Sequence, residues 1–253
     1  GMTGGASYLT PARLATTTLA LAALLAVSVL GATLVGPTPA SLWRALGPAG
    51  PASPDYVILV RTRLPRVLMA AVVGGSLGAA GAALQGLLGN PLACPHVLGI
   101  SAGAAVAGAA ALLAGGDAVS AAVPLAAFAG ALAALAIVFF AARAGGRTTP
   151  HAILLVGVVF NAIAAALLML INALSSYAQA HGVLFWIMGS LSTQSYGVVG
   201  AAAVYSLVGL GWLGWHAQAL NLLASGEEEA LHLGVEIERT RRGVFVAASL
   251  LVG

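Results

Sequence analysis

The chain has 253 residues, of which 60% are hydrophobic and only 7% are charged. A soluble domain carries about 25% charged residues, so this composition excludes an ordinary water-soluble protein. Lipid can cover such a surface, and only helices or closed barrels leave no backbone polar group unsatisfied there. The apolar stretches are continuous and do not alternate, which indicates spanning helices and not barrel strands. The net charge of +3 then reflects arginines at membrane borders and not nucleic acid binding.

Apolar runs long enough for a spanning helix, about 20 residues, recur along the chain. The sequence predicts six complete spans and the start of a seventh, at 14–35, 67–89, 97–115, 119–142, 152–174, 196–215 and from Gly243 onward. A Pro-rich connector is expected over 37–60 and a short lateral helix over 183–189. The first run is longer than a signal-peptide core, so we expect it to be retained. Gly1 before Met2 is typical of a residue left by tag removal in front of a native start methionine.

Alternation of the spans divides the arginines between two sides of the membrane. One side holds Arg13, Arg143, Arg147, Arg239, Arg241 and Arg242, and the other holds Arg44, Arg61, Arg63 and Arg66. The positive-inside rule makes the first side cytoplasmic, together with the N-terminus. The stretch RTRLPR therefore lies outside, where border arginines are disfavoured. Contact with lipid phosphates is one explanation for it, and a specific docking contact is the other.

The predicted spans contain no Asp, Glu, Lys or Arg. Ion-coupled transporters usually keep an ionisable group near the midplane, so this favours a pathway for a large ligand or a passive pore. Asn161 and Asn172 lie three turns apart on nearly one helix face and are candidates to line it. A helix–helix hydrogen bond is the more common role of such residues. Further pathway candidates, at and after the break that follows the second span, are Asn90, Pro91 and Ser101.

Residues 99–103 read Gly-Ile-Ser-Ala-Gly and match the G-x-S-x-G nucleophile elbow. That motif needs a strand–turn–helix context and a base, whereas this stretch lies in a Gly/Ala-rich helical run. An intramembrane serine protease using Ser101, with His151 or His216 as base, is therefore a minor alternative. Cys94 and His96 flank Pro95, but two ligands do not make a metal site, and none is expected.

The one strongly polar segment reads GEEEALHLGVEIERTRR and covers residues 226–242. Glu227, Glu228 and Glu229 suit the N-terminal end of a short helix, which Gly234 ends. A second short piece over 235–242 would complete a helix–turn–helix that lies flat on the cytoplasmic face. A leucine face framed by charges is typical of a docking surface and not of a mere connector. The residues expected to carry this contact are Glu227, Glu228, Glu229, Ala230, Leu233, Gly234 and Arg239.

Four motifs occur in order along the chain: RLPR at 63–66, GNPLACPHVLGISAGAA at 89–105, FWIMGS at 185–190 and GEEEALHLGVEIERTR at 226–241. Together they resemble the FecCD-type permeases, the membrane subunits of ABC importers for haem, ferric siderophores and cobalamin. The resemblance implies an all-α transmembrane bundle of the cobalamin-permease type, with one permease domain over 1–253. Such permeases have ten spans, and family members continue with a G-x-x-x-F-x-G-L-x-x-P-H segment. With about seven spans here, we expect the chain to be a fragment or incomplete.

The resemblance also implies partners: a second permease subunit, as a homodimer, two ATPase subunits and an external solute-binding protein at the bacterial inner membrane. Arg63 and Arg66, and less clearly Arg61, would meet acidic residues of that binding protein. Pro65 is expected to hold Leu64 extended, so that the arginines stand on a stiff turn.

The chain contains no lysine and therefore no G-x-x-x-x-G-K-[ST] phosphate loop. ATP and Mg²⁺ would be bound by the partner ATPase, and no cofactor is expected in this chain. An ion-coupled or passive carrier is the main alternative function, and the sequence leaves the identity of the chelate open.

Overall fold

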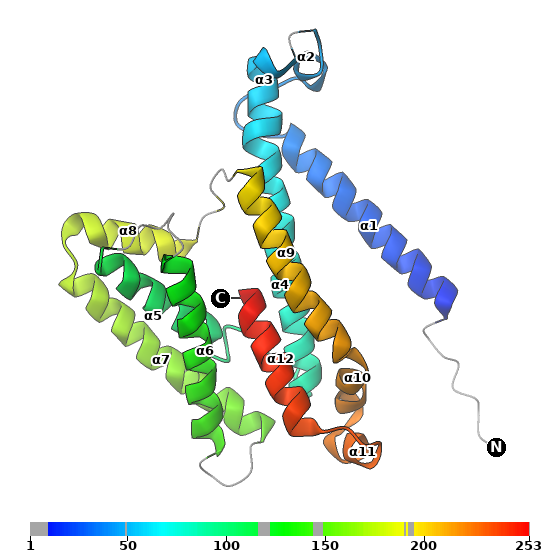
Figure 1. The fold of residues 1–253 in the computed structure, drawn as a ribbon, viewed down its shortest axis with the longest axis vertical. Coiled ribbons are helices and arrows are strands. Elements are labelled where there is room, and N and C mark those ends of the chain that lie inside the picture. Colours follow the sequence, from blue (N-terminus) through cyan, green and yellow to red (C-terminus); the bar gives the residue numbers. More distant parts are fainter. Residues whose placement is uncertain are drawn as a thin grey trace. The chain divides into compact units, whose positions relative to one another are not determined.

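The computed structural model describes residues 10–48, 50–115, 122–143, 149–189, 191 and 195–252. Helices are the only regular secondary structure in these ranges, which confirms the predicted all-α transmembrane bundle. The α-helices in chain order are α1 (Pro11–Leu34), α2 (Leu42–Ala45), α3 (Pro54–Tyr56), α4 (Leu64–Leu88), α5 (Ile100–Leu113), α6 (Ala122–Arg143), α7 (Pro150–Leu174), α8 (Tyr177–Met188), α9 (Tyr196–Trp215), α10 (Ala217–Ser225), α11 (Glu227–His232) and α12 (Ile237–Val252) (Figure 1). A 3-10 helix, η1 (Gly50–Ala52), and a π-helix, η2 (Val57–Arg63), complete the set. The interpretations of Gly1, Met2 and Arg147 concern residues outside the described ranges.

The chain divides into two compact units. The first consists of Gly1–Ala71 with Leu191–Val199, and the second of Val72–Ser190 with Gly200–Gly253. Helices α4 and α9 contribute residues to both units. The single permease domain expected over 1–253 stays a prediction.

Five of the described helices are long and apolar enough to cross a membrane, namely Pro11–Leu34, Pro54–Leu88, Ala122–Arg143, Pro150–Leu174 and Tyr196–Trp215. They agree within a few residues with five predicted spans, except that the second begins well before residue 67. The third predicted span holds only α5, whose 14 residues rise about 21 Å, less than the roughly 30 Å of a hydrocarbon core. The expected seventh run is α12, which already begins at Ile237.

The lateral helix α8 also begins earlier than expected, at Tyr177 and not near residue 183. Its start is a capping box. The backbone N–H of Ser176 donates to Gln179 Oε1 over 3.1 Å, and the Ser176 hydroxyl accepts from the backbone N–H of Gln179. These two reciprocal bonds satisfy helix-end donors, so polar residues that look like a loop form the first turn.

In the second unit, α5, α6, α7 and α8 lie side by side (Figure 1). The contact between α5 and α6 depends on small residues: a Cβ on Gly103 would overlap the backbone of Gly130. This fits the small-xxx-small packing expected from Gly99 and Gly103. The same expectation is not met at Gly74 and Gly78, where an added Cβ would meet nothing within 4 Å among the described residues.

In the first unit, the helix that carries the RLPR motif runs without a break through Pro65. Leu64 has helical angles, φ −57° and ψ −47°, so the expected extended geometry and stiff turn are wrong. The π-helical turns of η2 precede Pro65 and widen the helix, and Leu64 N–H bonds to the carbonyl of Leu59, five residues back. In that register Pro65, which has no N–H, leaves the Val60 carbonyl without a backbone donor. The Tyr196 hydroxyl donates to that carbonyl instead.

Candidate functional site

The polar segment forms a short helix, a turn and the beginning of a longer helix. Gly226, with φ 146°, separates α10 from α11, and Gly234, with φ 81°, follows α11. Both angles lie where residues with a Cβ are strained, which explains glycine at these two positions. The expected short helix from Glu227, ended by Gly234, is therefore present. The expected separate second piece over 235–242 is wrong, because residues from Ile237 onward belong to α12.

A buried arginine locks α11 to α12. The Arg241 side chain is 2% exposed, and its guanidinium donates to Glu227 Oε1 over 2.6 Å and to Glu238 Oε1 over 3.1 Å. Both carboxylates are about half exposed, whereas the guanidinium is shielded from water. Sequence reasoning missed this arrangement, although the i, i+3 spacing of Glu238 and Arg241 was a usable signal. It also gives Glu227 a structural role besides the predicted contact with a partner.

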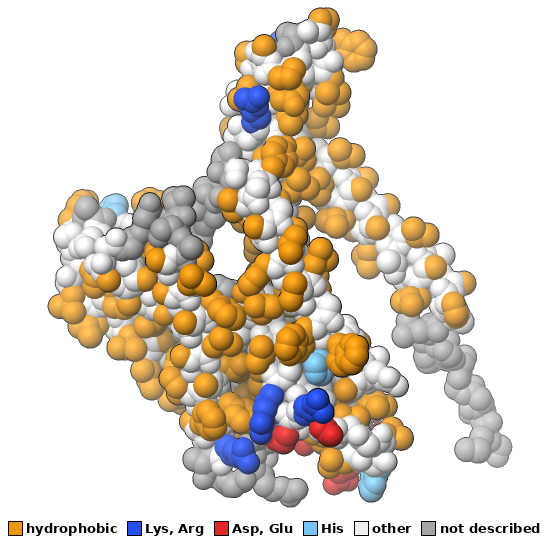
Figure 2. Space-filling view, in the orientation of Figure 1, with side chains coloured by type: hydrophobic (Ala, Val, Ile, Leu, Met, Phe, Trp, Pro, Cys, Tyr) orange, Lys and Arg blue, Asp and Glu red, His pale blue; other side chains and the backbone are white. Residues whose placement is uncertain are grey.

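The outer side of the segment is apolar and exposed. Leu231 and Leu233 are 59% and 66% exposed, whereas Ala230 is fully buried against the core. A shallow groove of about 700 Å³ lies beside them, with Val235 and Ile237 among its apolar residues and charged side chains around it. Figure 2 shows the acidic and basic side chains gathered over this region of the second unit. Glu228, Glu229 and Arg239 are exposed, as a docking role requires.

Arg63 is engaged within its own chain. Its guanidinium donates to the carbonyls of Thr33 and Leu34 at 3.4 and 3.1 Å, and also to the carbonyl of Thr38. These carbonyls lie at and just beyond the C-terminal end of α1, where unpaired carbonyls and the helix dipole favour a cation. Gly36 makes room, because a Cβ there would lie 2.6 Å from the guanidinium carbon. Arg63 therefore caps the first span, while the predicted docking role stays untested.

Arg61, Arg63 and Arg66 together are called the rim arginines. Arg61 and Arg66 have exposed side chains. A folded connector precedes them: Arg44 pairs with Asp55 at 3.2 Å, and the second carboxylate oxygen of Asp55 accepts from the Ser41 backbone N–H at 2.8 Å. The predicted Pro-rich connector is thus an ordered element of the first unit. It ties residues near the end of α1 to the start of the RLPR helix.

The pathway candidates are spread over several elements. The Asn161 amide of α7 donates to the His96 carbonyl at 2.7 Å, a structural bond to a turn and not the helix–helix bond considered for it. Asn172 lies about three turns further along α7 and is half-buried. The Asn90 side chain accepts from the Leu92 backbone N–H at 2.9 Å and so shapes the turn that contains the exposed Pro91. No described contact joins these residues into one site.

Ser101 lies in the first turn of α5 and is half-buried. Gly99 caps this helix with φ 81°, and the described residues before it form turns and not a strand. His216 Nδ1 is 3.0 Å from the Trp212 carbonyl oxygen. The His216 ring packs against Gly243 of α12. The strand–turn–helix context of a nucleophile elbow is therefore not found in the part of the chain that the structure describes.

Comparison with known proteins decides the family. The model of the FecCD transport family matches residues 19–253. The chain belongs to the FecCD transport family. This confirms the resemblance inferred from the four motifs and makes the chain a multi-pass membrane permease.

Three curated relatives illustrate the family. The chain is 38% identical over 195 residues to the cobalamin import permease BtuC of Halobacterium salinarum. It is 33% identical over 207 residues to the hemin transport permease HmuU of Yersinia pestis. It is 34% identical over 200 residues to the Fe(3+) dicitrate transport permease FecD of Escherichia coli K12. The matches cover 77–79% of this chain but only 52%, 60% and 62% of those relatives.

A solved structure shares the fold. It is an inward-facing conformation of a transporter assigned to the metal-chelate type of ABC transporter. The alignment has a TM-score of 0.76 and 26% identity, and it covers 92% of this chain and 72% of that chain.

Proposed function

We propose that this protein is the membrane-spanning subunit of an ATP-driven importer of a large iron- or cobalt-containing chelate. Relatives named for cobalamin, hemin and ferric dicitrate transport support this class of cargo. The chelate would arrive from an external solute-binding protein, and a second copy of the permease would complete the membrane part. Two separate ATPase subunits would bind ATP and Mg²⁺. We place the complex in a bacterial inner membrane with the N-terminus in the cytoplasm.

The observation that carries this proposal is the locked polar segment. Arg241 joins α11 to α12, so a force on the exposed face of α11 is transmitted to a helix whose later turns are buried in the second unit. Hydrogen bonds to charged groups contribute about 1.5–3 kcal/mol, so this contact holds α11 against α12. A carrier driven by an ion gradient has no need of such a device on its cytoplasmic side.

At the external side, the rim arginines are proposed to meet acidic residues of the binding protein. A guanidinium grips a carboxylate at two points, which makes arginine well suited to such a contact. Arg61 and Arg66 are exposed, whereas Arg63 also caps α1. We therefore assign the first contact with the partner to Arg61 and Arg66, with Arg63 holding the rim in place.

The experiment that tests the coupling proposal is Leu233→Asp. It would bring an unpaired charge into an apolar contact, which costs several kcal/mol. In the reconstituted complex, we expect the ATPase subunit to dissociate or ATP-driven uptake to be lost. Leu46→Asp is the matched control, because Leu46 is similarly exposed at 70% but lies in the external connector. Equal ATPase association and uptake in Leu233→Asp and wild type would refute the docking role.

A further inference from the structure

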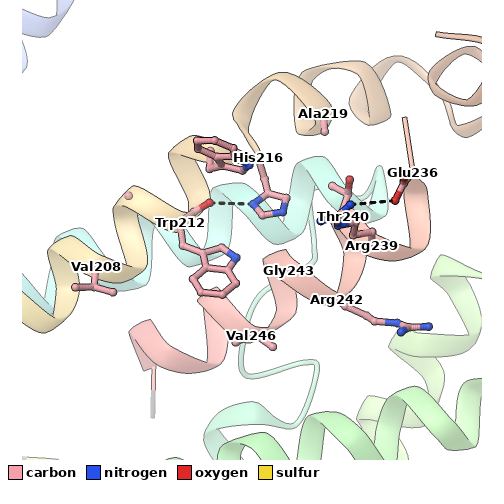
Figure 3. Close-up of a pocket in the computed structure, with 12 residues that line it drawn as sticks. Val208, Trp212, His216, Ala219, Glu236, Arg239, Thr240, Arg242, Gly243 and Val246 are labelled. Carbon is pink, nitrogen blue, oxygen red and sulfur yellow. Dashed lines mark hydrogen bonds and ion pairs between the residues drawn. The ribbon is translucent and has the colours of Figure 1, made fainter. Parts of the chain in front are cut away.

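A groove of about 1000 Å³ opens in the second unit between α9, the start of α10 and α12 (Figure 3). Its Glu236, Arg239 and Arg242 also border the shallow groove beside α11, whereas its α9 wall lies apart from that docking surface. One wall is the face of α9 that carries Val208, Gly211, Trp212 and Trp215, at the i, i+3, i+4, i+7 spacing of a single helix face.

The opposite wall repeats this spacing on α12. Arg239, Arg242, Gly243 and Val246 follow one another along one helix face. The groove therefore changes character along its length: Val208 and Val246 make one end apolar, and the two arginines of α12 make the other end cationic. Trp212 and Trp215 lie on the α9 wall of the groove. Tryptophan is enriched at membrane–water interfaces, so these two residues are consistent with a membrane border here.

The imidazole of His216 forms the floor of the groove and packs against Gly243. His216 Nδ1 is 3.0 Å from the Trp212 carbonyl oxygen, and a Cβ on Gly243 would lie 2.6 Å from His216 Nε2. Figure 3 shows the His216 ring next to Trp212, on the side of α9 that faces Gly243 of α12. The shape of the floor therefore depends on the bare backbone at Gly243.

The cationic end has an excess of positive charge. Glu236 pairs with Arg239 at 3.6 Å, but both side chains are more than 70% exposed, so water screens this pair and the contact is weak. Arg242 is exposed, and the described part of the chain offers it no hydrogen bond or ion pair. Two arginines thus face one glutamate at the predicted cytoplasmic border.

We propose that this groove binds an anionic phospholipid, with its phosphate on Arg239 and Arg242 and an acyl chain along Val208, Gly211 and Val246. An apolar end joined to a cationic end matches an amphiphile and not a soluble anion. Basic pockets between helices on the cytoplasmic side bind anionic head groups, and the guanidinium fork fits a phosphate. The site does not depend on what the protein transports.

The test is lipid retention by the full permease, measured by native mass spectrometry after exchange with phosphatidylglycerol or phosphatidylcholine that carry the same acyl chains. We expect phosphatidylglycerol to be retained preferentially. The double variant Arg239→Gln, Arg242→Gln should weaken its binding about 30-fold, at about 5-fold per arginine. Arg13→Gln with Arg61→Gln removes the same number of charges outside the groove and should keep wild-type retention.

A second pair of variants tests the apolar end without changing charge. Gly211→Leu fills the groove, and Gly214→Leu places the same side chain on α9 outside it; an added Cβ at either position meets nothing within 4 Å among the described residues. We expect only Gly211→Leu to lose phosphatidylglycerol. Equal retention of both lipids by wild type, or unchanged retention in the arginine double variant, would overturn the proposal. Displacement of the lipid by inorganic phosphate, or by the purified ATPase subunit, would instead assign the groove to a soluble anion or to that partner.

Discussion

Two arginines in the predicted partner-binding motifs make structural contacts within their own chain. Arg63 and Arg241 both belong to segments expected to bind partners, yet each holds its own chain together. Arg63 caps α1, and Arg241 joins α11 to α12. Each leaves neighbouring side chains exposed: Arg61 and Arg66 beside the first, and Leu231 beside the second. The partner contacts are therefore expected at the neighbours, which these two arginines hold in place.

The capping role of Arg63 predicts an effect at Gly36. In Gly36→Ala the added methyl group would displace the guanidinium from the carbonyls at the end of α1. Hydrogen bonds to charged groups contribute about 1.5–3 kcal/mol, so we expect a loss of stability of about 1–3 kcal/mol, seen as a lower thermal midpoint in detergent. Gly31→Ala is the control, because its Cβ meets nothing within 4 Å and alanine favours a helix. A Gly36→Ala protein as stable as Gly31→Ala would contradict the cap.

At the scale of elements, the attachment of α11 to α12 depends on one buried side chain. Arg241→Ala would leave Glu227 and Glu238 without their common partner. Because both carboxylates are about half exposed, we expect α11 to detach at a cost of about 1.5–3 kcal/mol, the contribution of hydrogen bonds to charged groups. Faster amide hydrogen exchange over residues 227–232 would report this. Arg239→Ala removes a highly exposed pair on the same helix, worth about 0–1 kcal/mol, and should leave exchange there unchanged. Similar exchange in the two variants would rule out the clamp.

Elements could be predicted from the sequence where one local pattern decides them. Five spans follow from runs of about 20 apolar residues, and the polar segment follows from its glutamates and glycines. The start of the RLPR helix could not be predicted, because the rule that proline ends a helix is local. Here a π-helical stretch accommodates Pro65, and the freed Val60 carbonyl is satisfied by Tyr196, which is 136 positions away in the chain. The contact of Arg63 with the end of α1 could not be predicted either, because it also joins residues that are far apart in the chain.

In the whole molecule, we propose that the external binding protein docks at the rim arginines and that the ATPase responds at the polar segment. A charge contact at a rim mostly governs the association rate and its salt sensitivity. The double variant Arg61→Glu, Arg66→Glu should therefore weaken capture of the binding protein, most strongly at low salt. We choose these two because reversing Arg63 would also uncap α1. Binding as tight as wild type at both low and moderate salt would mean that the arginines contact lipid phosphates instead.

We propose that this permease is driven by a partner ATPase in response to an external binding protein. The most direct test is ATP hydrolysis by proteoliposomes that contain the permease and its ATPase, assayed with and without the binding protein. We predict that hydrolysis rises when the binding protein is added, and that this rise disappears in Leu233→Asp and in Arg61→Glu, Arg66→Glu. Hydrolysis that does not respond to the binding protein, together with uptake driven by an ion gradient in the absence of ATP, would show that the permease is not an ATP-driven importer.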